Sequence, residues 1–250
     1  MDSNSVRHQV LVLMPALNEA GRIGAVIRGI DAALPGAKVV VVNDGSSDQT
    51  AEEAAAAGAT VLPHAFSMGY GASLETGYLY AERMAADFVL QMDGDGQHLP
   101  SELPLLLGSL TDGTADIVIG SRYAGRGCYC SPWVRRVGQR FFGAVLRVVT
   151  GRRFTDPTSG FQGLSRRAVR LFAAGVFPCD YPDADVLLMA HLAGLRIVEV
   201  PVEMKTREGG VSMHAGWKPF YYALKMSFSV FIVLLNRARW KRWGANPERA

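Results

Sequence analysis

The chain has few cysteines and no apolar stretch among its first ten residues. Its 250 residues include three cysteines, Cys128, Cys130 and Cys179, which fit no even-numbered set of disulfides, and the C-x-C pair lacks the spacing of a zinc or redox motif. Residues 1–10 contain no apolar stretch, so we expect no secretory signal and a cytoplasmic location. A chain of this length can bury its core without disulfides or a structural metal.

Motifs of three common enzyme classes are also missing. The first expected strand, Val10–Met14, leads into Pro-Ala-Leu-Asn-Glu and not into G-x-G-x-x-G, which argues against a dinucleotide-binding oxidoreductase. The sequence contains no G-x-x-x-x-G-K-[ST] phosphate loop. It also lacks the G-x-S-x-G elbow that is typical of Ser-His-Asp hydrolases.

Acidic residues are absent from one long window. From Arg122 to Arg153 there are eight Arg and no Asp, Glu or Lys, so the window carries +8 in a chain of net charge +3, and the remaining residues sum to −5. Guanidinium groups bind phosphates through paired hydrogen bonds, so this window suits an anionic ligand. Because the remaining chain is net acidic, a lipid phosphate is a better interpretation than nucleic acid, and we expect no nucleic-acid partner.

Short aliphatic runs alternate with segments of helical periodicity. Runs such as Val39–Val42 are typical of strands that are covered on both faces of a parallel sheet. The alternation predicts an α/β fold with a Rossmann-like, mostly parallel sheet, helices on both faces and right-handed crossovers. The expected strands are 10–14, 39–42, 60–62, 88–92, 116–119 and 196–200, and the expected helices are 21–34, 49–57, 72–85, 101–110, 165–173 and 184–193.

Carboxylates follow two of these strands, at the edge of the sheet where ligands of α/β proteins bind. Asp44 follows one strand, and its alternative interpretation is a helix cap or an Asx turn. Asp93 and Asp95 flank a glycine after another strand, with Gln97 nearby. Two neighbouring carboxylates repel each other unless a cation lies beside them, and hard oxygen ligands suit Mg²⁺ or Mn²⁺. A solvated acidic turn is the alternative for this pair.

The end of the chain changes character. Tyr221–Leu235 is almost wholly apolar, and residues 236–243 are basic and contain two Trp. Fifteen residues fall short of the roughly 20 that span a membrane. The pattern favours an interfacial helix, with Lys and Arg on anionic headgroups and Trp at the boundary. The alternative is a core or oligomer-interface helix with a solvated basic tail.

Seven segments together resemble glycosyltransferase family 2, and within it the polyprenyl- or dolichyl-phosphate sugar transferases such as dolichyl-phosphate mannosyltransferases. The likeness runs in family order from about residue 8 to residue 215. The segments are MPALNE (14–19), NDGSSDQT (43–50), MGYGASLETG (68–77), DGDGQH (93–98), GSRY (120–123), DPTSGFQ (156–162) and EVPVEMKTREGGVS (199–212).

The resemblance implies a GT-A fold and a metal-dependent, inverting transfer of one sugar. The donor would be a nucleotide-diphosphate sugar, and the acceptor would be a polyprenyl phosphate at the cytosolic face of the membrane. Residues 1–215 would form the catalytic domain, and the apolar and basic pattern described above predicts an interfacial helix with a basic tail for residues 216–250. We therefore expect a peripheral protein on the inner membrane face, in contact with the membrane surface or with a membrane-protein partner.

The same resemblance assigns roles to individual residues. The nucleoside pocket would be lined by Pro15, Ala16, Leu17, Glu19 and Asp44. The metal and the donor diphosphate would be held by Asp93 and Asp95, with Gln97 completing the metal site. The acceptor and donor phosphates would be held by Arg122, Arg135 and Arg207, with Ser212 adjacent. Asp156 would lie near the reacting centre.

A lipid phosphate is already an anion at pH 7, so Asp156 would orient groups and not remove a proton. Two other functions remain open: transfer to a soluble glycan or alcohol with Asp156 as general base, and a non-catalytic nucleotide-sugar-binding subunit. The chain also departs from the family pattern in two places. Asn43 replaces the first Asp of the usual D-D-G-S, and Tyr70 stands where many relatives carry Lys.

Overall fold

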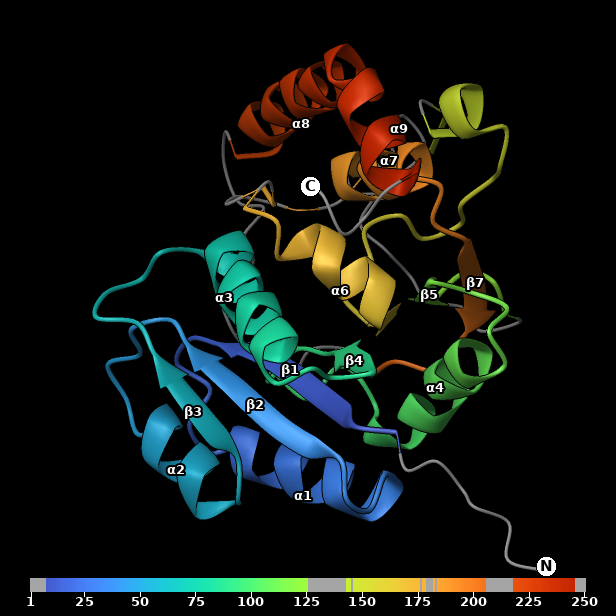
Figure 1. The fold of residues 1–250 in the computed structure, drawn as a ribbon. Helices are drawn as coiled ribbons and strands as arrows, with labels where there is room; N and C mark the ends of the chain where they lie inside the picture. The colour runs from blue at the N-terminus through green and yellow to red at the C-terminus, as the bar shows by residue number, and fades with distance from the viewer. Residues whose placement is uncertain are drawn as a thin grey trace, which may run out of the picture.

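One mixed sheet of seven strands forms the centre of the protein (Figure 1). The computed structural model describes residues 8–125, 143–144, 146–175, 177–178, 182, 184–205 and 218–245. Across the sheet the strands lie in the order β3-β2-β1-β4-β6-β5-β7. Their bounds are β1 Val10–Ala16, β2 Lys38–Asn43, β3 Thr60–Pro63, β4 Phe88–Gln91, β5 Ile117–Ser121, β6 Gln162–Ser165 and β7 Ile197–Pro201.

The sheet is parallel except at β6, which runs antiparallel to both β4 and β5. The predicted mostly parallel sheet is therefore confirmed, and all six predicted strands are present within a few residues of their expected bounds. The sequence analysis did not predict β6. Its sequence, Gln-Gly-Leu-Ser, has no β-branched residue and no alternation, so it carries no strand signal of its own.

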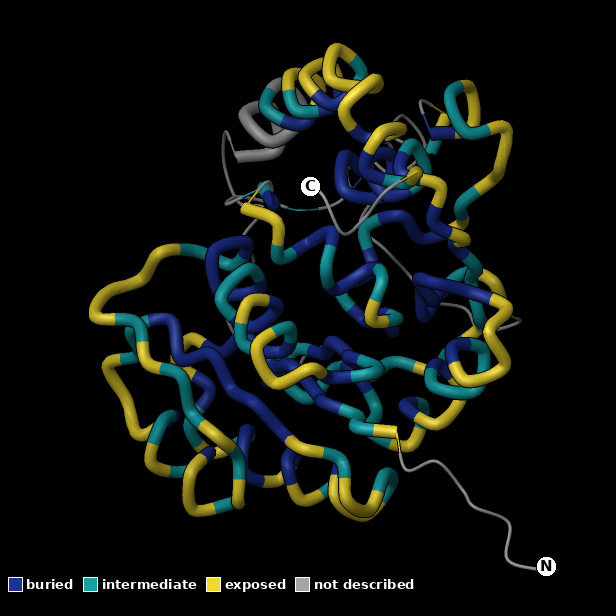
Figure 2. The backbone as a smooth tube through the Cα atoms, viewed as in Figure 1, coloured by how far each residue is buried: buried dark blue, intermediate teal, exposed yellow. Residues whose placement is uncertain are grey.

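Helices cover both faces of the sheet, as predicted. Leu11 and Leu13 of β1 join a core cluster shared with α3, α6 and α7, whereas Val12 and Met14 join a cluster shared with α1, α2 and α4. This alternation follows from the two-residue period of a strand, and Figure 2 shows the resulting burial. The helices are α1 Ile23–Ala33, α2 Thr50–Ala56, α3 Tyr70–Arg83, η1 Pro100–Glu102 (a 3₁₀ helix), α4 Leu103–Thr111, α6 Arg166–Phe172, α7 Ala184–Leu192, α8 Lys218–Leu235 and α9 Arg237–Ala245.

The C-terminal basic segment forms a helix that packs on the protein. α8 and α9 both contact α7. Trp240 and Trp243 of α9 are buried, and the indole N–H of Trp240 donates to the carbonyl oxygen of Val233 (3.0 Å). The prediction that these Trp side chains lie at a membrane boundary is therefore wrong, because they anchor α9 in the core. Among the described helices, none is both long and apolar enough to cross a bilayer.

The order of the strands reverses between β1 and β4. The chain proceeds outward from β1 to β2 and β3, and then returns to place β4 on the other side of β1. In open α/β sheets, ligands bind outside the carboxyl ends of the strands at such a reversal. The turns that follow β1 and β4 therefore form the first place to look for a functional site.

Candidate active site

The ends of β1 and β2 lie side by side, and the turns that follow them are cross-linked. Ala16 accepts a hydrogen bond from the backbone N–H of Asp44 (2.9 Å). The backbone N–H of Asn18 donates to Ser46 Oγ (3.0 Å), and Asn18 Oδ1 accepts from the N–H of Ser47 (2.9 Å). Asn18 has a φ of 56°, a conformation that asparagine adopts more readily than most residues. The sequence analysis did not single out Asn18, Ser46 or Ser47.

The other residues predicted for the nucleoside pocket lie in the same turn. Pro15 belongs to the end of β1, and Leu17 is 45% exposed directly after it. Glu19 is buried, and its carboxylate pairs with Arg22 (2.6 Å) while its backbone N–H donates to Thr50 Oγ1 (2.8 Å). The fold thus brings these predicted residues to one edge of the sheet. Their contact with a nucleoside stays a prediction.

Asp44 holds a neighbouring loop in place. Its Oδ1 contacts His64 Nδ1 (2.7 Å) and accepts from the backbone N–H of Met68 (2.8 Å). Its Oδ2 accepts from Ser67 Oγ (2.7 Å) and from the backbone N–H of Gly69 (2.9 Å). The helix-cap interpretation of Asp44 is wrong, because the N-cap residue of α2 is Gln49. Asp44 instead fixes the loop between β3 and α3, and His64 is a buried partner that the sequence analysis missed.

These contacts change the acidity of Asp44. Burial alone would raise the pKa of the carboxyl, but the hydrogen bonds from His64 and the loop outweigh it and lower the pKa to about 2. A carboxyl with a lowered pKa stabilises the folded protein above its unfolded pKa of 3.8, and this contribution is lost as the pH falls through about 2.

We therefore expect the melting temperature of the wild-type protein to fall more steeply than that of Asp44→Asn between about pH 5 and pH 2. The reason is that the Asp44 carboxylate has a higher pKa in the unfolded chain than in the folded protein, so protonation favours unfolding. The amide of the Asp44→Asn variant does not titrate. Circular dichroism melts across this range measure the two slopes. Asp31→Asn, at an exposed position, is the control and should keep the wild-type slope. Equal slopes for Asp44→Asn and the wild type would contradict this account.

Asp93 and Asp95 follow β4 at the reversal of strand order, where the sequence analysis placed them. Asp93 Oδ1 accepts from the hydroxyl of Tyr70 (3.0 Å). Asp95 Oδ1 accepts from the backbone N–H of Gln97 (3.0 Å), and its Oδ2 accepts from the side-chain amide of Gln97. Both carboxylates are partly exposed, so they remain accessible from solvent. Gln97 therefore contacts its predicted partner, and its carbonyl oxygen is the atom suited to a metal.

Two rings contact Asp93: that of Tyr70, which is partly buried, and that of His98, which is buried. Burial, and then the charge of Asp93, raise the pKa of Tyr70 well above its ordinary value, so its hydroxyl stays protonated and donates to the carboxylate. His98 Nδ1 accepts from the backbone N–H of Asp93 (3.0 Å), and its ring stacks on Phe161 with a centroid distance of 4.9 Å. Burial lowers the pKa of His98, so the ring is neutral at pH 7. The family departure at Tyr70 thus supplies a hydrogen-bond donor in place of a charge.

The donor set at this turn fits a hard divalent cation. Within the described residues, no group of three or more His, Cys, Asp or Glu side chains could enclose a metal. The available ligands are instead two carboxylates and one amide oxygen on a partly exposed turn. Mg²⁺ and Mn²⁺ bind in this way when water and substrate phosphates complete their coordination. The residues present therefore suit a metal that is shared with a phosphorylated substrate.

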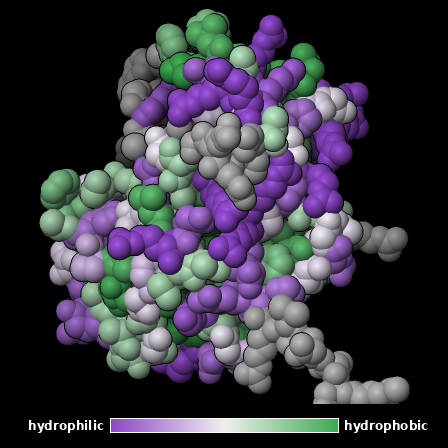
Figure 3. Space-filling model, viewed as in Figure 1, coloured by the Kyte–Doolittle hydropathy of each residue, from purple (hydrophilic) through white to green (hydrophobic). Residues whose placement is uncertain are grey.

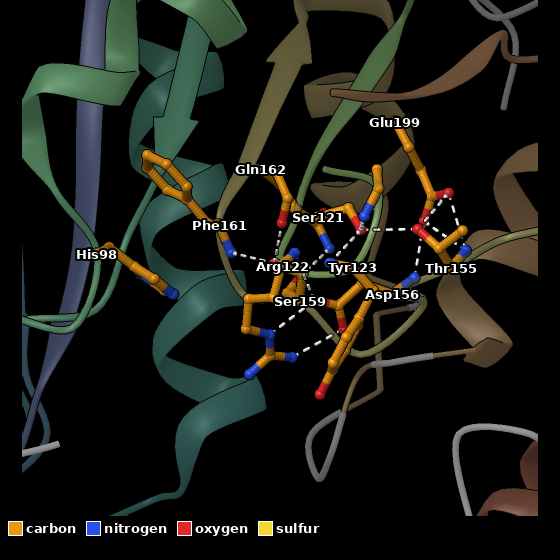
Figure 4. Close-up of polar contacts among 12 residues, drawn as sticks. His98, Ser121, Arg122, Tyr123, Thr155, Asp156, Ser159, Phe161, Gln162 and Glu199 are labelled. Atoms are coloured by element: carbon orange, nitrogen blue, oxygen red, sulfur yellow. Dashed lines mark hydrogen bonds and ion pairs between the residues drawn. The ribbon is translucent and has the colours of Figure 1, made fainter. Parts of the chain in front are cut away.

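Arg122 and Asp156 form a buried ion pair beside this turn (Figure 4). Arg122 Nε donates to Asp156 Oδ2 (2.6 Å), and Arg122 Nη2 donates to Oδ1 (2.7 Å). The backbone N–H of Arg122 also donates to Oδ2 (3.2 Å). The Asp156 carboxylate is fully buried and Arg122 is 9% exposed. The two residues predicted for the reacting centre and the phosphate are therefore direct partners.

The segment after Asp156 connects this pair to the acid pair. Gly160 has no room for a side chain, since a Cβ there would lie 2.7 Å from Tyr70 Oη and 3.5 Å from Asp93 Oδ2. Ser159 Oγ donates to the carbonyl oxygen of Gly120 (2.6 Å), which holds the segment against β5. The buried ring of His98 lies within electrostatic reach of four charged residues, Asp93, Asp95, Arg122 and Asp156. The structure thus gathers the predicted catalytic residues into one site.

Glu199 of β7 anchors the segment that carries Asp156. Its carboxylate accepts from the backbone N–H of Thr155 (2.8 Å), from the backbone N–H of Asp156 (2.8 Å) and from Thr155 Oγ1 (3.0 Å). Thr155 Oγ1 also lies 2.7 Å from Ser121 Oγ at the end of β5 (Figure 4). Glu199 opens the last of the seven family-like segments, and the sequence pattern alone assigns it no role. Its contacts indicate that it positions the ion pair.

Glu199→Gln is expected to lower kcat by about tenfold or more with a smaller change in the KM of the donor. An amide presents one acceptor oxygen in place of two, so the Asp156 segment shifts and misaligns Arg122. Steady-state kinetics with varied donor measure the split between kcat and KM. Glu203→Gln removes an exposed carboxylate of the same motif and should behave as wild type. Equal effects of the two substitutions would contradict the positioning role.

Two predicted phosphate ligands, Arg135 and Arg207, and the adjacent Ser212 lie outside the described residues. The described chain after β7 does approach the acid pair, since the backbone N–H of Lys205 donates to the carbonyl oxygen of Gln97 (2.9 Å). In the Arg-rich window, Arg152 donates to the carbonyl oxygen of Ile197 (3.2 Å). At least one arginine of the window therefore makes a structural contact, and phosphate binding by the window stays a prediction.

Comparison with known proteins identifies the family. The model of glycosyl transferase family 2 matches residues 11–172. The chain is 31% identical over 217 residues to polyprenol monophosphomannose synthase of Mycolicibacterium smegmatis, covering 83% of this chain and 82% of that protein. It is 30% identical over 217 residues to undecaprenyl-phosphate mannosyltransferase of Micrococcus luteus, and this match covers 83% of this chain and 88% of that protein.

The fold is also found among solved structures. Glucosyl-3-phosphoglycerate synthase of Mycobacterium tuberculosis, in complex with Mn²⁺ and UDP-glucose, aligns with a TM-score of 0.68 at 23% identity. The alignment covers 90% of this chain and 80% of that chain. At this identity the likeness concerns the fold, and it confirms the predicted GT-A architecture.

Proposed function

This chain belongs to glycosyltransferase family 2, and we propose that it transfers one sugar, with inversion, from a nucleotide-diphosphate sugar to a polyprenyl phosphate. The observation that carries the acceptor class is the burial of Asp156 with both oxygens bound by Arg122. A hydroxyl acceptor needs a base with an accessible lone pair, whereas a lipid phosphate is already ionised at pH 7. The names of two relatives, polyprenol monophosphomannose synthase and undecaprenyl-phosphate mannosyltransferase, support the same acceptor class.

In this proposal each group of residues in the site has a separate role. The turns after β1 and β2 hold the nucleoside, with Asp44 keeping the adjacent loop in place. Asp93 and Asp95, with Gln97, would hold a divalent cation and, through it, the donor diphosphate. When bound, Mg²⁺ or Mn²⁺ would offset the charge that develops on the departing nucleotide diphosphate. Arg122 is oriented by Asp156 and, together with Arg135 and Arg207, holds phosphate groups.

A product assay tests this function. The purified full chain is incubated with a panel of nucleotide-diphosphate sugars, polyprenyl phosphate and Mn²⁺ or Mg²⁺, and lipid products are analysed by mass spectrometry. We expect one chelator-sensitive glycolipid whose anomeric configuration is opposite to that of the donor. The absence of any lipid product across a broad donor panel would contradict the proposal.

The same assay separates the two alternatives. With a soluble glycan or alcohol acceptor, product forms without lipid, and the rate rises with pH as a general base loses its proton. With a non-catalytic subunit, the chain binds a donor tightly and neither hydrolyses nor transfers it. The buried Asp156, with both oxygens bound by Arg122, favours the lipid phosphate over the hydroxyl acceptor.

A further inference from the structure

α8 carries two apolar faces, and the described protein covers one of them. Met226, Val230 and Val233 are buried in the core cluster that includes α7. A second set of large apolar side chains is 55–67% exposed and repeats at intervals of three and four residues, which places it along one face of the helix. This set, the apolar stripe, consists of Phe228, Phe231, Ile232 and Leu235.

A basic surface adjoins the apolar stripe. α9 follows α8 after one residue and exposes four cations, Arg237, Arg239, Lys241 and Arg242. Within the described part of the chain, none of these four forms an ion pair with an acid. Residues 218–245 include six Lys and Arg and no Asp or Glu. In Figure 3, hydrophobic and hydrophilic side chains lie next to each other over this end of the molecule.

The two buried Trp residues give this surface a fixed shape. Trp240 and Trp243 are 6% and 5% exposed and belong to the same core cluster as α7. α8 is also tied to α7, because the hydroxyl of Ser229 donates to the buried carboxylate of Asp185. The apolar stripe and the cations are therefore presented together on a preformed helical pair.

The charges indicate what covers this surface. Cations beside an apolar face match the headgroups and the acyl boundary of an anionic bilayer. A second copy of the chain is a poor match, because a twofold contact through this face would bring two sets of exposed cations together. No helix in the described part of the chain is long and apolar enough to cross a bilayer.

We infer that α8 and α9 form a docking surface for anionic lipid, with the apolar stripe inserted at the boundary and the α9 cations on the headgroups. The side chains of Trp240 and Trp243 stabilise this surface by packing in the core, and they do not contact lipid. This inference deepens the proposed function by assigning the surface through which the enzyme meets its lipid-linked acceptor. It is tested by vesicle binding without donor or acceptor, so that its failure is distinct from a failure of transfer.

The first test is vesicle flotation of the full chain. Wild-type protein should float with vesicles of phosphatidylglycerol and phosphatidylcholine, and much less with pure phosphatidylcholine or at high salt. The double variant Phe231→Asp/Ile232→Asp should bind at least about tenfold more weakly, since charges replace inserted side chains. Leu105→Asp places the same change at an exposed apolar position of α4 and should bind as wild type. Unchanged binding of the double variant would overturn the inference.

The second test removes charge without touching the apolar stripe. Arg239→Ala/Lys241→Ala should weaken binding to the anionic vesicles by roughly fivefold for each cation removed. Arg28→Ala/Lys38→Ala removes the same charge from exposed positions of α1 and β2 and should have a much smaller effect. Equal losses in the two variants would show a general charge effect and would overturn the assignment.

Two further measurements test whether the double variant is folded and catalytically active. Circular dichroism should show wild-type melting for Phe231→Asp/Ile232→Asp, because both side chains are exposed. This variant should also retain wild-type transfer to a short, water-soluble polyprenyl phosphate, which shows that docking and chemistry are separable. A dimer in light scattering that dissociates in the variant, without wild-type binding to vesicles, would overturn the lipid assignment in favour of self-association.

Discussion

Asp95→Ala is expected to lower the transfer rate by about 10³-fold or more and to leave the melting temperature close to that of the wild type. Asp95 is a partly exposed carboxylate in a turn, and Gln97, two residues away, donates two hydrogen bonds to it. Its removal therefore disturbs little packing. It does remove one of the two carboxylates that would hold the cation beside the departing diphosphate.

The control for this substitution is Asp112→Ala, which removes an exposed carboxylate just after α4. It should keep full activity and the wild-type melting temperature. Initial rates with saturating donor and Mn²⁺, combined with circular dichroism melts, measure both quantities. A variant at Asp95 that keeps more than about a tenth of the wild-type rate would show that the acid pair is not the catalytic metal site.

Asp156→Ala is expected to reduce both stability and activity. Arg122 is nearly buried, and it would lose a partner that supplies two short hydrogen bonds. Removing one member of a buried ion pair leaves the other charge uncompensated, which costs about 3–5 kcal/mol. For a protein of this size the melting temperature should fall by roughly 10 °C or more. Arg122→Ala should lower stability and activity to a similar extent. The sequence alone predicts only a phosphate ligand, whose removal would leave the stability of the fold unchanged.

A double variant separates the charge effect from the packing effect. Arg122→Met/Asp156→Leu replaces the pair with apolar side chains and should be more stable than either single alanine variant, while remaining inactive. Denaturant unfolding provides the free energies for this cycle. If the single and double variants lose stability additively, the ion pair does not couple the two residues. If the double variant transfers sugar at the wild-type rate, the pair has no part in the reaction.

The local pattern of the sequence was sufficient for much of the fold. Continuous aliphatic runs such as Val39–Val42 predict buried parallel strands, and their carboxyl ends predict the edge where Asp44 and Asp93 lie. β6 escaped prediction because its four residues take their conformation from β4 and β5, which pair with it on either side. The contacts of a strand of this kind are set by the sheet and not by its own residues.

The candidate catalytic residues are easier to predict from the sequence than the residues that position them. Asp93 and Asp95 are recognisable because they are close together in the sequence. Arg122 and Asp156 are 34 residues apart, and Asp156 and Glu199 are 43 apart, so no local pattern links them. The roles of Trp240 and Trp243 were misjudged for a related reason. A Trp in a basic helix suits either a membrane boundary or a core, and the packing of α9 on α7 decides between them.

The most direct test of this account is the binding of Mn²⁺ in the presence and absence of nucleotide diphosphates, followed by electron paramagnetic resonance. We predict weak binding of Mn²⁺ alone and markedly tighter binding with one nucleoside diphosphate, because Asp93 and Asp95 leave coordination positions for phosphate oxygens. In Asp95→Asn the nucleotide-dependent binding should be lost, while Asp112→Asn should retain it. Mn²⁺ binding that is indifferent to nucleotide, or that persists unchanged in Asp95→Asn, would contradict the assignment of the site.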